Sequence, residues 1–287
     1  MPKEINITFV KSPLNVPSIV AKNNQLFEKE FDGIEVNFPE ITAGSKQSEA
    51  LAAGALDFCN PIGGTSAILA AANGVDLKII SIYSRAPKAF RIVTKSPDIQ
   101  TIADLKGKKI AGPKGTVLHQ LLATALAKNN LKYEDVEHVA MDQPAAVSAL
   151  MNGSVDAVLV AAGEANRAVK AGGRVLTTGE DLVQGTIVVA VRGEFLEKYP
   201  ELVQRFRDVQ KQSLDFIKDN QEEALEMAAK ELQVPLDEVK EMYAWYDSDP
   251  TIRESDIEDL DATQDFLVSS GMLEKTIEIE DLIVESN

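Results

Sequence analysis

The chain has 287 residues, 45% of them hydrophobic and 26% charged, and a formal net charge of −16 at pH 7. This length favours two lobes over one core, and the acidic charge argues against nucleic acid or an anionic membrane surface as a partner. With one cysteine and two histidines, neither an internal disulfide nor a histidine-rich metal site is expected. No apolar run approaches the ~20 residues of a membrane span. We therefore predict no metal and no other cofactor.

Strand and helix signals alternate from the N-terminus onward. Strands are predicted at 5–10, 34–38, 57–60, 77–83, 109–111, 136–139, 155–160 and 174–177, and helices at 16–31, 45–53, 65–73, 102–105, 116–129, 144–151 and 164–171. Strands separated by single helices indicate an α/β fold with a mostly parallel sheet flanked by helices. After about Gly193, helices predicted at 200–218, 222–232, 235–245 and 254–270 are expected to pack on a lobe already formed.

An internal match connects the two halves of the chain. Segment 50–57 (A-L-A-A-G-A-L-D) and segment 149–156 (A-L-M-N-G-S-V-D) align at a constant offset of 99 residues. Each is predicted to end a helix at glycine, which adopts the left-handed C′ conformation without strain, and then to open a strand with an acidic residue. A chance match of a common pattern is the alternative. We interpret the match as two related α/β lobes.

The same offset aligns two loops that follow the matched strands. Gly64-Thr65-Ser66 falls opposite Gly163-Glu164-Ala165, and each loop leaves the carboxyl end of a strand and begins a helix. Open α/β sheets bind ligands at that edge, where helix N-termini present free N–H groups. The sequence therefore predicts a ligand cleft gripped from both lobes.

Several stretches resemble one family of solute-binding proteins. They are 51–58 (L-A-A-G-A-L-D-F), 66–80 (S-A-I-L-A-A-A-N-G-V-D-L-K-I-I), 102–111 (I-A-D-L-K-G-K-K-I-A) with K-G-T at 114–116, and 150–157 (L-M-N-G-S-V-D-A). They are similar to the NMT1-like receptors of nitrate, taurine, aliphatic-sulfonate and thiamine-precursor importers. The resemblance implies the two-lobed type II periplasmic-binding-protein fold. A discontinuous first lobe is expected at 1–92 and 190–287, a second lobe at 93–189, and crossings near 91–94 and 187–191.

The resemblance also implies a function. We expect a monomeric, extracytoplasmic substrate-binding component of an ABC importer that closes by a hinge on a small anionic or zwitterionic molecule, such as a sulfonate, phosphonate or carboxylate. Its partners would be that ligand and the permease subunits. The N-terminus is predicted to enter a strand at once. We therefore expect either a cytosolic protein or an exported protein whose leader is absent. The resemblance favours the second, a periplasmic protein or a membrane-anchored lipoprotein.

The strongest candidates for ligand binding are Gly64, Thr65 and Ser66. Glycine permits close backbone approach, and hydroxyls beside helix N–H groups can hold an anion, although plain helix capping explains Ser and Thr equally well. Weaker candidates in other strand-end loops are Ser12, Asn15, Ser45, Ser84, Gly163 and Gln184.

Four charged or polar residues have two interpretations each. Thr116 and His119 lie at a second predicted helix start, in the second lobe, and could bind a ligand there. A single helix histidine, however, more often packs inside the protein. Arg85 follows a predicted strand and could clamp an anion with two hydrogen bonds, or it could be a solvated surface residue. Glu164 could receive an amine, or favour the N-terminus of its helix.

One departure from the family pattern concerns the ligand. Where sulfonate and taurine receptors often have Trp-Asp-Pro, this chain has Ala161-Ala162-Gly163, so the expected aromatic wall and acidic group are missing. A pyrimidine, a thiamine precursor or an amine therefore stays open as an alternative ligand.

Two other classes of protein with a two-lobed α/β fold are alternatives to a solute receptor. A thiamine-pyrimidine synthase of the same fold needs a cysteine-rich active segment, which Cys59 alone cannot provide, and no nucleophile motif or metal dyad is present. We therefore predict no catalytic residues and no enzyme activity. A ligand-sensing domain of a regulator would need a separate DNA-binding partner chain.

Overall fold

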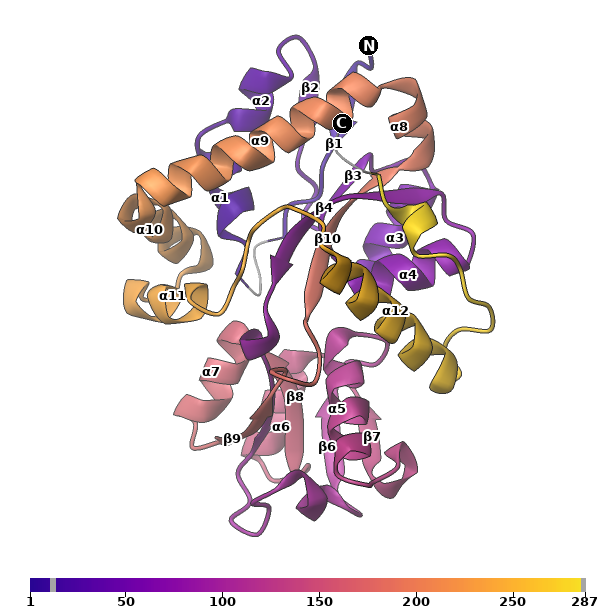
Figure 1. Ribbon diagram of the computed structural model, residues 1–287. Coiled ribbons are helices and arrows are strands. Elements are labelled where there is room, and N and C mark those ends of the chain that lie inside the picture. The colour runs from indigo at the N-terminus through magenta and orange to yellow at the C-terminus, as the bar shows by residue number, and fades with distance from the viewer. Residues whose placement is uncertain (11–13, 285–287) are drawn as a thin grey trace. The chain divides into compact units, whose positions relative to one another are not determined.

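Figure 1 shows alternating strands and helices along the chain. The structure is a computed structural model that describes residues 1–10 and 14–284. It separates into two units, one made of Met1–Arg85 with Thr186–Asn287 and the other of Ala86–Gly185. The chain therefore passes between the units after Arg85 and again after Gly185.

The observed boundaries lie a few residues before the predicted ones. Strand β5 (Phe90–Thr94) pairs with β8 (Ala157–Ala161) and β9 (Arg174–Thr178) of the second unit. Strand β10 (Thr186–Arg192) pairs with two strands of the first unit. Both segments were predicted as crossings. Backbone pairing instead makes each of them a strand within one sheet.

The first unit contains two small sheets. Its elements are β1 (Glu4–Asn6), α1 (Val16–Asn23), α2 (Leu26–Glu30), β2 (Glu35–Asn37), α3 (Gly44–Ala52), β3 (Phe58–Gly63), α4 (Gly64–Ala72), β4 (Leu77–Arg85), β10, α8 (Gly193–Lys198), α9 (Pro200–Asp219), α10 (Gln221–Leu232), α11 (Leu236–Tyr243) and α12 (Glu254–Ser269). Strands β1 and β2 pair in parallel. In the other sheet, ordered β3-β10-β4, strand β10 runs antiparallel to both neighbours. Strands β3 and β4 therefore point the same way, and their carboxyl ends share one edge.

The core of the first unit forms two hydrophobic clusters. One joins α4 and α12 to the β3-β10-β4 sheet and includes Ile68 and Leu260. The other places the apolar stripe of α9 against α1 and α2, with Phe206 stacked on Phe58 at 4.4 Å between ring centroids and 5.0 Å from Phe27. Large aromatic rings bury much apolar area, and stacked pairs add about 0.5–1.5 kcal/mol beyond that burial.

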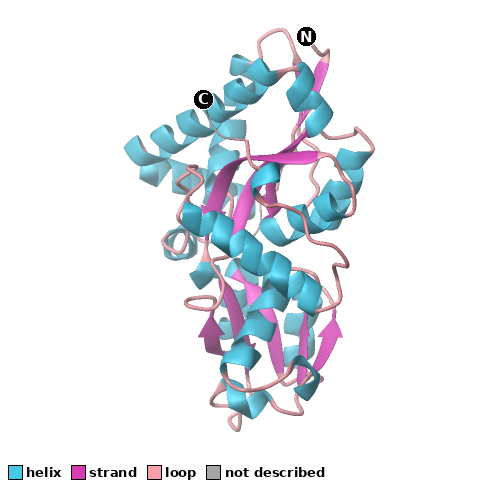
Figure 2. Cartoon of the chain, turned by 45° about the vertical axis from the view of Figure 1, so that its right-hand side comes forward, coloured by secondary structure: helices cyan, strands magenta, loops and turns pink. Residues whose placement is uncertain are grey.

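The second unit contains one five-stranded sheet. Its elements are β5, β6 (Lys109–Gly112), α5 (Val117–Lys128), β7 (Glu137–Ala140), α6 (Gln143–Met151), β8, α7 (Ala162–Lys170) and β9, with short 3-10 turns at Pro87–Ala89, Ile102–Leu105 and Tyr133–Asp135. The strand order is β7-β6-β8-β5-β9. Strands β6, β7 and β8 are parallel, and only β5 runs against its neighbours. Figure 2 shows helices around the strands of each unit.

The internal match corresponds to a repeated structure. After α3 and after α6, a glycine with positive φ ends the helix, at Gly54 (φ +70°) and Gly153 (φ +77°). The aspartate that follows fastens a neighbouring strand in both units: Asp57 Oδ2 accepts the N–H of Asn6 at 2.9 Å, and Asp156 Oδ2 accepts the N–H of Lys109 at 2.8 Å. The two segments therefore share both conformation and hydrogen bonds.

The fold class agrees with the prediction from sequence. Each unit is an α/β layer structure, and in each the chain returns through one antiparallel strand. Within the described residues, we find no helix with the length and apolar character needed to cross a membrane.

Candidate ligand-binding site

Two helix N-termini of the first unit meet beside the carboxyl edge of its sheet. Helix α4 follows β3 without a loop, and neither its N-cap, Gly63, nor Ala43, the N-cap of α3, provides a side-chain cap. Gly44 in the first turn of α3 lies directly against Ser66 of α4, so closely that a Cβ at Gly44 would collide with the serine side chain. Uncapped N–H groups of helix starts attract anions, and here two such starts are adjacent.

Two buried hydroxyls of the first unit have no hydrogen-bond partner among residues 1–10 and 14–284. Thr65 is 2% exposed and Ser84 is 1% exposed, and among the described residues neither side-chain oxygen has a hydrogen-bond partner. Ser84 of β4 pairs with Ile187 of the central strand β10, and Ile187 pairs on its other side with Gly63, the N-cap of α4. A buried hydroxyl without a partner costs about 1–3 kcal/mol, so each position fits a group that bonds a ligand.

Polar groups at the start of α1 have hydrogen-bond partners within the protein. The Asn15 side-chain amide donates to the carbonyl of Val10, and the N–H of Ser18 donates to the hydroxyl of Tyr83 at 3.1 Å. Burial raises the pKa of Tyr83 far above its usual value. Asn15, predicted to contact a ligand, therefore holds the chain before α1 instead. Ser12 lies outside the described residues.

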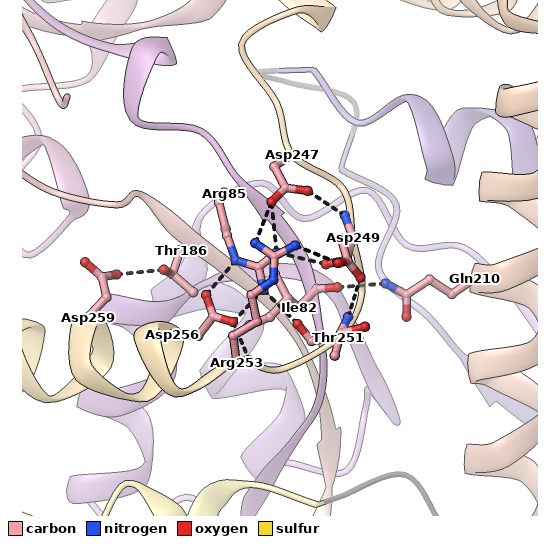
Figure 3. Close-up of polar contacts among 10 residues, drawn as sticks. All are labelled: Ile82, Arg85, Thr186, Gln210, Asp247, Asp249, Thr251, Arg253, Asp256 and Asp259. Atoms are coloured by element: carbon pink, nitrogen blue, oxygen red, sulfur yellow. Dashed lines mark hydrogen bonds and ion pairs between the residues drawn. The ribbon is translucent and has the colours of Figure 1, made fainter. Parts of the chain in front are cut away.

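Arg85 does not have the role of an anion clamp. Its side chain is buried and donates from Nε to Asp256 Oδ1 at 2.6 Å and from Nη2 to Asp256 Oδ2 at 2.5 Å (Figure 3). The remaining donors reach Asp247 Oδ2 at 3.3 Å and the carbonyls of Asp249 at 3.0 Å and Thr251 at 2.7 Å. A guanidinium has five N–H donors, and all five are used. These contacts do not support the predicted ligand clamp, because carboxylates of the C-terminal segment already neutralise this charge.

In the second unit, the loop before α5 also leads into a helix start without a side-chain cap. Thr116 is the N-cap of α5 but makes no capping bond, and its hydroxyl donates weakly to the carbonyl of Pro113 at 3.4 Å. The N–H of Gly115 donates to Nδ1 of His119 at 3.2 Å. His119 is 4% exposed, so its ring lies under the loop and does not face a ligand. These contacts favour the internal interpretation of this histidine.

The start of α7 carries three predicted residues. Gly163 is exposed and has open space around its Cα, and Glu164 is half-buried with Oε2 3.3 Å from Arg167 Nε. The helix has no side-chain cap, and its first residue, Ala162, has a positive φ of 41°. Non-glycine residues adopt this conformation at a cost of about 1–3 kcal/mol.

The remaining predicted residues lie apart or make other contacts. Ser45 is exposed in the first turn of α3, and Gln184 is half-buried beside the second crossing and has a protein partner. One polar group was not selected from the sequence: the hydroxyl of Tyr246 is buried without a hydrogen-bond partner among the described residues. The aromatic pair Trp245-Tyr246 at a helix end was the available signal, but such pairs usually serve packing.

Missing side-chain caps are common in this chain, including α8, α9 and α10 away from the predicted site, whereas α6 has one. Asp142 caps α6 by accepting the N–H of Ala145 at 2.9 Å. The helices without a side-chain cap after β3, β6 and β8 are those that leave strand ends of the predicted site. The arrangement offers neutral N–H and O–H donors suited to binding an anion.

The described residues hold no group of three or more His, Cys, Asp or Glu that could bind a metal. Cys59 is fully buried, and burial raises the pKa of its thiol to about 12. A thiolate is the reactive form of cysteine, so this side chain is not a nucleophile at neutral pH.

The fold and these helix starts define a solute-binding protein of the type II periplasmic class. The periplasmic aliphatic sulphonate binding protein SsuA from Escherichia coli superposes with a TM-score of 0.89 at 26% identity, covering 100% of this chain and 94% of that one. The alkanesulfonate-binding protein SsuA from Xanthomonas axonopodis pv. citri, bound to MOPS, has the same fold at a TM-score of 0.89 and 24% identity over 99% of each chain.

Sequence similarity identifies the family. The chain belongs to the family described as NMT1/THI5 like, whose pattern it matches over residues 13–224. It is 32% identical, over 98% of its length and 86% of the other, to a Bacillus subtilis (strain 168) protein named "Putative aliphatic sulfonates-binding protein". It is 31% identical to the taurine-binding periplasmic protein of Escherichia coli (strain K12), over 70% of this chain and 63% of that protein. The family resemblance predicted from sequence is confirmed.

Proposed function

We propose that this protein is the substrate-binding component of an importer and that its ligand is an organic sulfonate. The observation that supports this most directly is the pair of uncapped helix starts with the buried, unpartnered hydroxyls of Thr65 and Ser84. A sulfonate has three acceptor oxygens and no proton to donate. It therefore needs several donors, which these groups provide.

The neutrality of the donors favours a sulfonate over a phosphonate. The one arginine predicted to meet the ligand, Arg85, is neutralised by Asp256 and Asp247. A phosphonate approaches two negative charges at neutral pH and would need a cation, whereas helix N-termini carry only about half a unit of positive charge each. A sulfonate keeps a single charge, and a carboxylate has one oxygen fewer. The names of the similar proteins support the same ligand class.

The other parts of the proposal follow from the same class of protein. We propose a monomer that is exported to the periplasm or outer cell surface, delivers its ligand to permease subunits and has no catalytic activity. The buried Cys59 supports the last point. A desulfurization enzyme, DszB, shares the fold at a TM-score of 0.76 and 16% identity, which is a likeness of fold alone. Hinged closure on the ligand stays a prediction, which small-angle scattering with and without taurine would check.

Titration calorimetry tests the ligand class. We expect taurine or ethanesulfonate to bind at pH 7.5, and ethylphosphonate and propionate to bind at least about tenfold more weakly, a difference of about 1.4 kcal/mol. Equal or tighter binding of the phosphonate or carboxylate would contradict the proposal.

Thr65→Val tests the hydroxyl itself. Valine keeps the shape of threonine and removes a buried oxygen that has no protein partner, so the melting temperature should stay equal or rise. Sulfonate affinity should fall about tenfold or more, because a hydrogen bond to a charged group contributes about 1.5–3 kcal/mol. Thr65→Ser is the matched control and should bind like the wild type. Unchanged affinity in Thr65→Val would remove Thr65 from the site.

A further inference from the structure

Both histidines of the chain lie together in the second unit. His119 of α5 and His138 of β7 have ring centroids 5.1 Å apart, and Tyr133 lies 5.0 Å from His119 and 5.9 Å from His138. His119 is buried and His138 is half-buried. The three rings form a compact group beneath the loop that connects β6 to α5, which we call the histidine clamp.

Each histidine holds one end of that loop. Nδ1 of His119 accepts the N–H of Gly115 at 3.2 Å, and Nε2 of His138 lies 3.1 Å from the carbonyl oxygen of Gly112. The hydroxyl of Tyr133 lies 2.5 Å from the other nitrogen of His138, Nδ1. The backbone between Gly112 and Gly115 is thus fixed at both ends by imidazole nitrogens.

These contacts determine the protonation of both rings. Because an N–H group donates to Nδ1 of His119, that nitrogen carries no proton and the ring is the neutral Nε2–H form. The carbonyl of Gly112 requires a proton on Nε2 of His138, and the hydroxyl of Tyr133 can then donate to its Nδ1. A proton added to His119 Nδ1 would set two N–H groups against each other. The hydrogen bond from Gly115 therefore requires a neutral His119, whereas His138 keeps both contacts in either protonation state, because the hydroxyl of Tyr133 can also accept.

We propose that His119 and His138 are positioning residues that hold the 112–116 loop, and with it the start of α5, in place, and that His119 does so only while its ring is neutral. The loop ends at Thr116, the N-cap of a helix that has no side-chain cap. Acid would therefore release one of the two anion-binding loops of the protein. The expected effect of acid on ligand affinity rests on the proposed function. The expected effect of acid on the loop does not.

The surroundings of the clamp favour the neutral rings. Burial first, then His138 and Lys114, lower the pKa of His119 to about 4, and burial also lowers the pKa of His138. The neighbouring turns that pack on α5 also bring carboxylates, but these have other partners. Asp104 accepts the N–H of Thr101 at 2.7 Å, and Asp135 accepts the N–H of Lys132 at 2.8 Å.

Nitrogen-15 NMR of the histidine side chains tests the clamp without any ligand. The chain has only two histidines, so both rings can be assigned in the intact protein. We expect both to be the neutral Nε2–H form at pH 7.5 and His119 to stay mostly neutral at pH 5.5, where an ordinary histidine is largely protonated. A ring with its proton on Nδ1, or an ordinary titration of His119 near pH 6.5, would overturn the proposal.

Two variants separate the hydrogen bond from the titration. His119→Asn keeps an acceptor at the position of Nδ1 but cannot titrate, and His119→Leu removes the acceptor. The amide of Gly115 should exchange with solvent several-fold faster in His119→Leu and at nearly the wild-type rate in His119→Asn. Equal exchange in all three proteins would overturn the proposal. If His119→Leu does not fold, the wild-type NMR and His119→Asn still decide it.

Taurine binding then shows whether the loop matters to the ligand. Because burial lowers the pKa of His119 to about 4, wild-type affinity should change little from pH 7.5 to pH 5.0 and fall about threefold to fivefold by pH 3.5, within the range expected for losing one neutral hydrogen bond. His119→Asn should lose less than about twofold over the same range. Equal pH dependence in both proteins would overturn the role in binding. If taurine does not bind at any pH, the proposed function fails, and the NMR result still judges the clamp.

Discussion

The Arg85 cluster of the first unit and the histidine clamp of the second make an instructive pair. Arg85 and His119 were each predicted as ligand contacts, and each turns inward to hold backbone at the edge of a predicted site. They use opposite electrostatics. Arg85 carries a charge that buried Asp256 neutralises, whereas His119 works only as a neutral acceptor. A permanent charge at a strand end draws its own counter-ion from the protein, which leaves neutral donors for a ligand.

Breaking the charged cluster should have the largest effect. Asp256 is 0% exposed and accepts from Arg85 twice and from the N–H of Arg253. Asp256→Asn leaves the guanidinium buried without its counter-ion, so the free energy of unfolding should fall by about 3–5 kcal/mol. Urea denaturation measures this. Asp247→Asn, at a side chain that is 44% exposed, is the control and should cost less than about 1 kcal/mol. Equal losses would show that burial of the pair is not what matters.

The histidine clamp should show a smaller effect that depends on pH. Burial lowers the pKa of His119 to about 4 in the folded protein, against about 6.5 in the unfolded chain. The unfolded chain therefore binds the proton first, so stability is lost as the pH falls from about 6.5 toward 4. Urea midpoints at pH 7.5 and 5.0 should differ more for the wild type than for His119→Asn. The same difference in both proteins would mean that other groups cause the loss.

The smallest effect is expected at the rim of the charged cluster. Hydrogen bonds from the N–H of Thr251, and then from Arg253, lower the pKa of Asp249 to about 2. Its stabilisation is therefore present above the usual carboxyl pKa near 4 and lost as the pH falls toward 2. Because the side chain is 42% exposed, Asp249→Asn should cost less than about 1 kcal/mol at pH 7. A loss as large as that of Asp256→Asn would contradict the distinction between centre and rim.

Local patterns predicted much of the fold. The helix–glycine–strand match located two equivalent turns, Gly54 and Gly153, because a positive φ is a property that sequence signals directly. The loop Gly64-Thr65-Ser66 was placed correctly at a helix start, because glycine and hydroxyl residues are common at the N-termini of helices. The boundaries between the units were less accurate, since they depend on which distant strand β5 and β10 pair with.

The roles of Arg85 and His119 could not be predicted because their partners are distant or are set by packing. Arg85 and Asp256 are separated by 171 residues, and no local signal connects them. His119 stands four residues after Gly115, a spacing that permits their bond. Whether its ring faces outward or lies under the loop depends on how α5 packs against Tyr133 and His138.

The segment that fastens Arg85 has a consequence for how this chain is made. Strand β4 is bordered by backbone bonds from Ile82 to Pro250 and between Arg85 and Asp247, and these partners leave the ribosome long after β4 itself. Ala86–Gly185 is a complete unit by then. Since domains generally fold as units during synthesis, the middle of this polypeptide can reach its native form before its beginning does.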